Sequence, residues 1–216
     1  LMYFNGAMLD RSRSSDAEVA EWSTRLAALL IPMSKSIGAD VGNELTSMAL
    51  QIFGGMGYVE ETGASQYMRD IRIAAIYEGT NGIQGQDLVM RKLGGDAGST
   101  VNTFLDSFAD TIARLAADPS TATFAAQLTS SFGDARRASD WLNNADSTID
   151  KLGGATPYTR LLGTALAGAL CGKALLAAKA HLDAGELGAV DRAFYEGKIV
   201  NARFFGEQIL PATSGL

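Results

Sequence analysis

The sequence is poor in the residues from which disulfide frameworks and metal centres are built. Its 216 residues include one cysteine, Cys171, and one histidine, His181. Neither has a partner nearby in sequence, so we expect no disulfide framework and no metal site. Cys171 lies among Ala, Leu and Gly and is typical of a small buried hydrophobe. His181 stands in an apolar run and is more typical of a structural residue than of a catalytic one.

The chain also has an excess of negative charge and lacks two motifs for nucleotide binding. Its formal net charge is −6 and its pI is about 4.8, which argues against a nucleic-acid partner. No Gly-x-x-x-x-Gly-Lys-Ser/Thr run is present, and the glycines from Gly54 to Gly57 have the wrong spacing for a dinucleotide fingerprint. No signal peptide pattern is visible at the start. The opening Leu1, Met2 and Tyr3 are typical of a cut, so we expect a longer parent protein.

Strand patterns are missing as well, because runs of alternating apolar and polar residues are scarce. Instead, apolar residues recur at intervals of three or four residues, which predicts helices. The predicted fold class is all-α, with a helical bundle in residues 1–95 and a second helical region in residues 96–216. Helices are expected at residues 1–11, 17–30, 39–53, 65–72, 83–92, 101–117, 124–144, 158–181 and 191–210.

Prolines and glycines interrupt this periodic pattern. Pro32 is expected to kink or restart a helix, and Pro157, which follows a pair of glycines, to break another. The run at residues 161–180 is nearly apolar, so a membrane-spanning helix has to be considered. Charged and small residues in and beside the run argue against that interpretation, and we expect no membrane partner. The charged residues are Arg160, Lys173 and Lys179.

The most informative stretch runs from Gln51 to Gln84 and reads QIFGGMGYVEETGASQYMRDIRIAAIYEGTNGIQ. It opens with a glycine-dense turn, where the lack of Cβ atoms would let the backbone pass close to a flat or anionic group. Glu78 follows an apolar run and precedes a glycine, a place where desolvation favours a carboxylate as a general base. Taken alone, it is more typical of a carboxylate that complements a helix dipole. Thr80 or Asn81 is expected to cap the next helix.

The middle of this stretch is charged and then apolar. A short helix is expected in the charged part, with Tyr67 and Met68 facing inward. Arg69 and Asp70 would form either a solvated ion pair or contacts that hold the adjoining loop, and the sequence favours neither. Residues 73–77 are too few for periodicity to separate a strand from a helical turn.

The whole stretch resembles the signature of the flavin-dependent acyl-CoA dehydrogenases. The patterns Gln-x-x-Gly-Gly-x-Gly-Tyr, Tyr-Met-Arg-Asp and Ile-Tyr-Glu-Gly-Thr-Asn appear intact and in order. The resemblance implies that Glu78 is the catalytic base and that Gly79 keeps the backbone close to the acyl chain. Many family members carry glutamine where this chain has Gly82. The implied FAD contacts are Gln51, Gly54 and Gly55 from a neighbouring subunit, and Thr80 and Asn81 from the same subunit.

The reaction implied by the resemblance is α,β-dehydrogenation of an acyl-CoA thioester. A base removes the α-proton while a hydride leaves the β-carbon, and the backbone N–H of Glu78 would donate to the thioester oxygen. The implied cofactor is FAD, the implied acceptor an electron-transfer flavoprotein, and the implied assembly a homo-oligomer. Residues after about 95 resemble the extra helical region of a subgroup that includes enzymes acting on methylthiopropionyl-CoA.

Two other functions remain open. An acyl-CoA oxidase would share Glu78 and differ in oxygen access, whereas a non-catalytic helical assembly module would have no need of that carboxylate. The chain has no strand pattern for the family's middle β-domain, so we expect weak or no activity from the isolated chain. The single cysteine fits a reducing compartment, and we expect a cytoplasmic protein.

Overall fold

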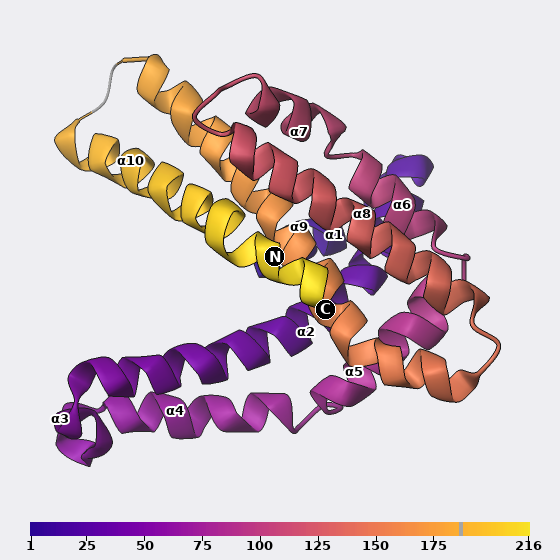
Figure 1. Ribbon diagram of the computed structural model, residues 1–216, viewed down its shortest axis with the longest axis horizontal. Coiled ribbons are helices and arrows are strands. Elements are labelled where there is room, and N and C mark those ends of the chain that lie inside the picture. Colours follow the sequence, from indigo (N-terminus) through magenta and orange to yellow (C-terminus); the bar gives the residue numbers. More distant parts are fainter. Residues whose placement is uncertain (186–187) are drawn as a thin grey trace. The chain divides into compact units, whose positions relative to one another are not determined.

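The computed structural model describes residues 1–185 and 188–216, and within them every regular element is helical (Figure 1). The predicted all-α class is therefore confirmed, and the open choice at residues 73–77 is a helical turn. The elements are α1 (Met2–Arg11), α2 (Ala17–Phe53), α3 (Gly55–Tyr58), η1 (Glu60–Thr62), α4 (Ala64–Arg72), η2 (Ile73–Ala75), α5 (Asn81–Asp87), η3 (Leu88–Leu93), α6 (Ser99–Asp106), α7 (Ala109–Ala116), α8 (Ala122–Asn144), α9 (Thr148–Asp183), α10 (Ala189–Phe204), η4 (Phe205–Ile209) and η5 (Leu210–Gly215).

The chain divides into two compact units. The first unit comprises residues 2–95 and 146–159, and the second comprises residues 96–145 and 160–216 together with Leu1. Helix α9 therefore begins in the first unit and continues in the second. The predicted domain boundary between residues 95 and 96 stays a prediction.

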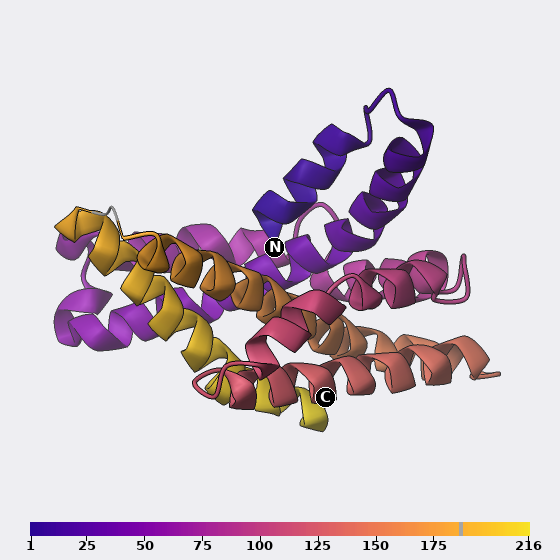
Figure 2. The ribbon, with the colours of Figure 1, turned by 90° about the horizontal axis from the view of Figure 1, so that it is seen from above.

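In the first unit, the other elements are arranged on helix α2. Asp16 caps its N-terminus, where the side chain accepts hydrogen bonds from the backbone N–H groups of Glu18 and Val19, satisfying donors that a helix start leaves unpaired. Helix α1 lies beside the first half of α2, and Figure 2 shows the two as an indigo and violet pair. The buried apolar side chains of this half include Leu26, Leu29, Leu30 and Met33.

Helix α2 does not end at Pro32, so the prediction of a restart there is wrong. The helix continues for 37 residues, from Ala17 to Phe53. An interior proline removes one intrahelical hydrogen bond and costs about 3 kcal/mol. Pro32 is itself buried, and its neighbours Leu30 and Met33 have no exposed surface, so apolar burial offsets that loss.

Beyond about residue 40, α2 runs antiparallel to α4, and α3 with η1 joins the two helices at the tip of this hairpin (Figure 1). Apolar side chains of the hairpin remain exposed, with Ile52 at 84%. Tyr67 and Met68 are 72% and 43% exposed, so the expectation that they face inward is wrong. The reason is geometric, since α4 packs mainly on α2 and only one side of it is covered.

The second unit has an apolar core of its own. The ring of Phe108 meets those of Phe104 and Phe132, with centroids 5.2 and 6.0 Å apart. Close packing also depends on a glycine, because a Cβ on Gly206 would lie 2.2 Å from the ring of Phe124. Only a residue without a Cβ fits there.

Two further predictions about helix breaks are wrong. Helix α9 runs unbroken through Pro157, where the adjacent Tyr158 is 2% exposed, so tertiary burial again offsets the proline. Conversely, the helix expected at residues 101–117 is divided into α6 and α7. The Ser107 hydroxyl donates to the carbonyl of Phe104 at 2.6 Å, a local bond of the kind that competes with helix continuation.

Among the described residues, one helix, α9, is long and apolar enough to cross a membrane by length and composition alone. Of its most apolar window, 56% is buried, which is the pattern of a core helix. Charged residues of this helix have partners within the second unit. The Lys173 ammonium lies 4.7 Å from the centre of the Phe108 ring, and Lys179 forms an ion pair with Asp118.

Candidate functional site

The loop between η2 and α5 carries Glu78 in an uncommon backbone conformation. Glu78 has a φ of 54° and Gly79 a φ of 82°, so two consecutive residues are left-handed. Glycine adopts this region freely, whereas a residue with a Cβ costs about 1–3 kcal/mol there and persists only where its surroundings fix it. The contacts of this loop therefore determine where Glu78 stands.

Hydrogen bonds from two directions fix the loop. The Gln84 amide Nε2 donates to the carbonyl of Glu78 at 3.1 Å, and Lys35 Nζ donates to the carbonyl of Gly79 at 2.6 Å. Thr80 then caps α5, where its Oγ1 accepts from the N–H of Ile83 at 3.3 Å, which confirms the predicted cap. The carbonyls of both left-handed residues are thus held.

Asn81 ties the same loop to α2. Its Nδ2 donates to Asp40 Oδ1 at 2.7 Å and to the carbonyl of Ser36 at 3.2 Å, while its Oδ1 accepts from Lys35 Nζ at 3.0 Å. Both amide hydrogens are therefore used, and Oδ1 keeps one lone pair for a ligand. A flavin contact at Asn81 stays a prediction, and it would use that lone pair or the backbone.

Glu78 itself is exposed, so the described residues do not supply the apolar shielding expected from the sequence. Its backbone N–H has no hydrogen-bond partner among the residues that the structure describes. A pocket of about 370 Å³ opens beside it, also lined by Gly79 and by the ion pair of Asp87 with Arg91. The Asp87 carboxylate raises the pKa of Arg91. A carboxylate and a free N–H donor of one residue thus lie at the wall of an open pocket.

The glycine turn stands at the end of α2. Gly54 has φ 62° and ψ −148°, and its N–H donates to the carbonyl of Gln51 at 3.1 Å. A Cβ on Gly54 or Gly55 would meet nothing within 4 Å, whereas a Cβ on Gly57 would lie 2.5 Å from the carbonyl oxygen of Leu50. Gly57 is therefore required by packing, while Gly54 and Gly55 expose bare backbone that a flat group could approach.

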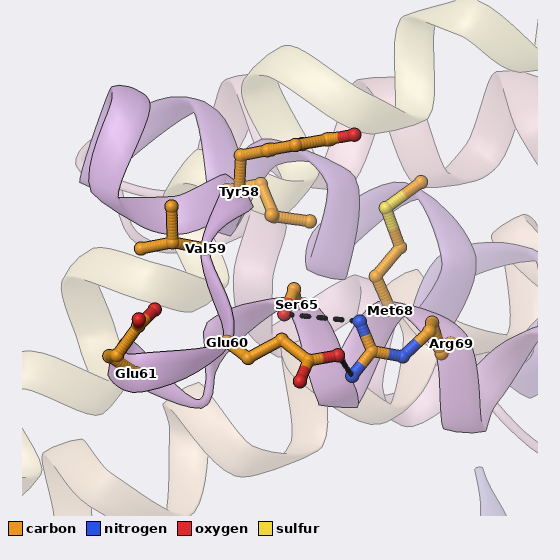
Figure 3. A pocket seen from close by; sticks show the side chains of 8 residues that line it. Tyr58, Val59, Glu60, Glu61, Ser65, Met68 and Arg69 are labelled. Carbon is orange, nitrogen blue, oxygen red and sulfur yellow. Dashed lines mark hydrogen bonds and ion pairs between the residues drawn. The ribbon is translucent and has the colours of Figure 1, made fainter.

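A second pocket, of about 600 Å³, lies beside this turn and is lined by α2, η1 and α4 (Figure 3). Arg69 points into it between two partners, Glu60 at 3.3 Å and the Ser65 hydroxyl at 3.3 Å, whereas Glu61 points away from them (Figure 3). The ion pair that Arg69 forms is thus with Glu60, is exposed to solvent, and joins α4 to the preceding turn. Tyr58 lies on the opposite side of the pocket from Arg69 (Figure 3).

The structure does not bring the two groups of predicted site residues together. Gln51, Gly54 and Gly55 lie at the tip of the hairpin, whereas the loop at residues 78–81 lies beside the middle of α2 (Figure 1). Lys35 touches that loop, and Gln51 lies 51 − 35 = 16 residues further along α2, which is about 24 Å at 1.5 Å per residue. The two groups thus lie on separate surfaces of the first unit.

Other candidate residues have structural surroundings. His181 stacks on Tyr195, with ring centroids 4.6 Å apart. Cys171 is partly buried, and desolvation raises the pKa of its thiol. The described residues contain no group of three or more His, Cys, Asp or Glu placed to hold a metal ion.

Sequence reasoning missed three residues of the site, namely Lys35, Asp40 and Gln84. Gln84 was within reach of inference, because it lies six positions after Glu78 on the helix that Thr80 caps. Lys35 and Asp40 act from more than 40 residues away, and a single sequence carries no signal for such a long-range contact.

Two family models match the chain. The family described as "Acyl-CoA dehydrogenase, C-terminal domain" matches residues 14–93, and the family described as "Acetyl-CoA dehydrogenase C-terminal like" matches residues 104–216. The second match alone covers more than half of the chain. All the predicted site residues lie in the first match.

Named relatives agree with these matches. The chain is 34% identical to a 3-methylmercaptopropionyl-CoA dehydrogenase of Ruegeria pomeroyi, over 95% of this chain and 35% of the relative. It is 32% identical to a broad-specificity linear acyl-CoA dehydrogenase of Mycobacterium tuberculosis, over 89% of this chain and 33% of the relative. It is 31% identical to a butyryl-CoA dehydrogenase of Syntrophomonas wolfei, over 94% of this chain and 33% of the relative. The chain thus spans about a third of the length of these relatives.

Proposed function

Because the chain belongs to the acyl-CoA dehydrogenase family, we propose that it forms the C-terminal part of an FAD-dependent acyl-CoA dehydrogenase with Glu78 as the catalytic base. The proposal concerns the natural protein that contains this chain in full, since the chain spans about a third of its relatives. For the 216 residues alone we expect weak or no activity.

The observation that carries the proposal is the fixed, left-handed turn at Glu78. The carbonyls of Glu78 and Gly79 are held by hydrogen bonds, while the Glu78 N–H is free to donate. In the proposed reaction the Glu78 carboxylate takes the α-proton of the thioester. The N–H of the same residue donates to the thioester oxygen, on which negative charge develops as that proton leaves.

The residues predicted to hold FAD fit a flat ligand. Gly54 and Gly55 leave open backbone, since an added Cβ would meet nothing within 4 Å. An added Cβ on Gly82 would make only an ordinary contact, with Thr80 Oγ1 at 3.8 Å, so glycine there leaves room. A bound flavin supplies the hydride acceptor for the β-carbon. The chain's own part is to position that group through Gln51, Gly54, Gly55, Thr80 and Asn81.

The distance between the two groups of site residues supports a homo-oligomer. Gln51, which precedes the glycine turn, lies about 24 Å along α2 from Lys35 at the Glu78 loop, taking 1.5 Å per residue, so this end of the hairpin serves another copy's site more readily than its own. The hairpin around the turn also exposes apolar side chains such as Leu45, Ile52 and Phe53. Exposed apolar surface of this kind is typical of subunit interfaces.

For the substrate class, the relatives support the proposal. The printed names of the relatives refer to 3-methylmercaptopropionyl-CoA, linear acyl-CoA and butyryl-CoA, and an acyl-CoA thioester is the substrate class they share. We extend that class to this protein, with an electron-transfer flavoprotein as acceptor and the cytoplasm as its location.

The test is anaerobic mixing of the natural protein with 3-methylmercaptopropionyl-CoA and, separately, with butyryl-CoA. Loss of the oxidised flavin absorbance, together with a product two hydrogen atoms lighter by mass spectrometry, is the expected result. A flavin-loaded protein that leaves both thioesters unchanged would contradict the proposal. Admitting oxygen afterwards tests the oxidase alternative, which requires stoichiometric hydrogen peroxide at a rate that sustains turnover.

A further inference from the structure

Lys35 makes the contact that joins helix α2 to the backbone of the Glu78 loop. It is partly buried, and its ammonium donates to the carbonyl of Gly79 at 2.6 Å and to Asn81 Oδ1 at 3.0 Å. Hydrogen bonds from a charged donor are stronger than neutral ones, and the strength grows where water is partly excluded. The cation is thus directed at the carbonyl of the residue that follows the proposed base.

The backbone conformation gives this contact its importance. Left-handed Glu78 is strained and needs surroundings that fix it. Gln84 holds the Glu78 carbonyl from α5, an element that follows the same loop, whereas Lys35 holds the Gly79 carbonyl from α2. Lys35 therefore anchors the loop to α2, whose first half has a buried apolar side, while Gln84 can move with the loop.

Asn81 adds further hydrogen bonds between the loop and α2. Its amide links the Lys35 ammonium to Asp40 and to the Ser36 carbonyl, all on α2. Two adjacent turns of α2, one with Lys35 and Ser36 and the next with Asp40, thus hold the loop through a lysine and an amide. These contacts restrict movement of the loop both parallel and perpendicular to the axis of α2.

Resting on the proposed function, we propose that Lys35 is a positioning residue for the base. Its ammonium holds the Gly79 carbonyl so that the Glu78 carboxylate and N–H keep their places relative to the substrate α-carbon and thioester oxygen. Lys35 takes no proton and touches no reacting atom in this scheme. Its loss lets the loop relax toward an unstrained conformation, which displaces both groups at once.

Three variants of the natural, flavin-loaded protein test this role. Lys35→Met keeps the aliphatic stem and removes the ammonium, whereas Lys35→Arg keeps a cation with N–H donors for two acceptors. Arg25→Met is the matched control, because Arg25 stands on the same helix and its partner Glu21 is an exposed residue 3.8 Å away. Each variant is mixed anaerobically with the acyl-CoA that the unmodified protein oxidises, and bound flavin and the melting midpoint are recorded beside the rate.

For Lys35→Met, the rate of flavin bleaching at saturating substrate should fall by roughly 10- to 100-fold, as expected for a displaced catalytic group. The half-saturating substrate concentration should change by less than about 3-fold, because binding contacts remain. Flavin content and the melting midpoint should stay at the unmodified values. Lys35→Arg should regain most of the rate, and Arg25→Met should bleach like the unmodified protein.

Two results would overturn the role of Lys35. One is bleaching of Lys35→Met at the unmodified rate, and the other is a slower rate that follows a loss of flavin or of stability, which would make Lys35 a structural residue. Failure of the proposed function is distinct from both results. In that case no acyl-CoA would bleach the flavin of the unmodified protein, and the two proposals would fall together.

Discussion

In the first unit the hairpin of α2 and α4 leaves large apolar side chains in solvent, whereas in the second unit the side chains between α6 and α9 form a buried core and the exposed ones lie mainly on α10. Ile52 and Phe53 at the hairpin tip are 84% and 54% exposed. In the second unit Phe108, Phe124 and Leu128 have no exposed surface. Both regions are helical and apolar, so composition does not explain the difference.

The difference lies in the number of neighbours that each region finds within the chain. The second unit supplies several helices around its phenylalanines, and its large exposed apolar residues lie mainly on α10, with Val190 at 84%. The hairpin has two helices and covers only their shared side. The exposed apolar side of the hairpin, which carries the glycine turn, is therefore suited to burial against another protein surface. The core of the second unit is already buried by its own helices.

The same substitution in the two regions should have unequal effects on stability. Phe124→Ala in the second unit should lower the free energy of unfolding by about 3–5 kcal/mol, because it leaves a cavity. Phe53→Ala in the hairpin should lower it by less than about 1 kcal/mol, since little burial is lost within the chain. Urea denaturation of the 216-residue chain, followed by circular dichroism, measures both. Equal losses would show that the hairpin is packed in the isolated chain.

Within the hairpin, the glycine turn combines a packed position with an open one. Gly57→Ala should destabilise the tip by about 1–3 kcal/mol, as overpacking does, because its Cβ would meet backbone of Leu50. Gly55→Ala should leave stability unchanged and lower flavin content in the assembled natural protein. Urea denaturation and flavin absorbance separate the two. A Gly55→Ala protein with full flavin would remove Gly55 from the predicted contacts.

The proposed interface can be tested with two residues of equal exposure. Ile52 and Val190 are both 84% exposed, one on the hairpin and one on α10. Ile52→Lys should weaken self-association of the natural protein at least about tenfold, or roughly 1.4 kcal/mol, because it buries an unpaired charge. Val190→Lys should leave the sedimentation profile unchanged. Equal behaviour of the two variants in analytical ultracentrifugation would mean that the hairpin is not the interface.

The smallest effect is expected from the ion pair between Lys179 and Asp118 in the second unit. The hydrogen bond from Lys179, with help from Ser120, lowers the pKa of Asp118 from 3.8 to about 2. The stabilisation is therefore complete above about pH 4 and is lost as the pH falls through 2. Asp118→Asn should remove this part of the acid dependence of the melting midpoint, and Lys179→Met should remove most of it, because the hydrogen bonds from Ser120 remain. An unchanged acid dependence in Lys179→Met would show that the lysine does not stabilise the Asp118 carboxylate.

Local chemistry made much of the fold predictable. Helical periodicity located most of the helices, and Thr80 caps α5 as its side chain predicts. The failures came where packing overrides local preference. Helices continue through Pro32 and Pro157 because the residues around them are buried, and apolar residues of the hairpin are exposed because the chain offers them no neighbour.

The site residues likewise fall into those that a local motif predicts and those that depend on packing. The motif around Glu78 drew attention to the loop, and the structure adds its left-handed conformation. The contacts of Lys35 and Asp40 with that loop depend on how α2 and α5 pack, and no local pattern encodes such a contact. Roles for Gln51, Gly54 and Gly55 stay predictions that depend on a second copy.

Replacement of Glu78 by glutamine tests the central claim most directly. The change keeps the shape of the side chain and removes the group proposed to take the α-proton, while Thr80, Asn81 and the glycine turn are left alone. In anaerobic mixing with acyl-CoA, the Glu78→Gln natural protein should retain its flavin and bleach at least about 10²–10⁴ times more slowly than the unmodified protein. Bleaching at the unmodified rate with flavin fully bound would contradict the account and place the base elsewhere.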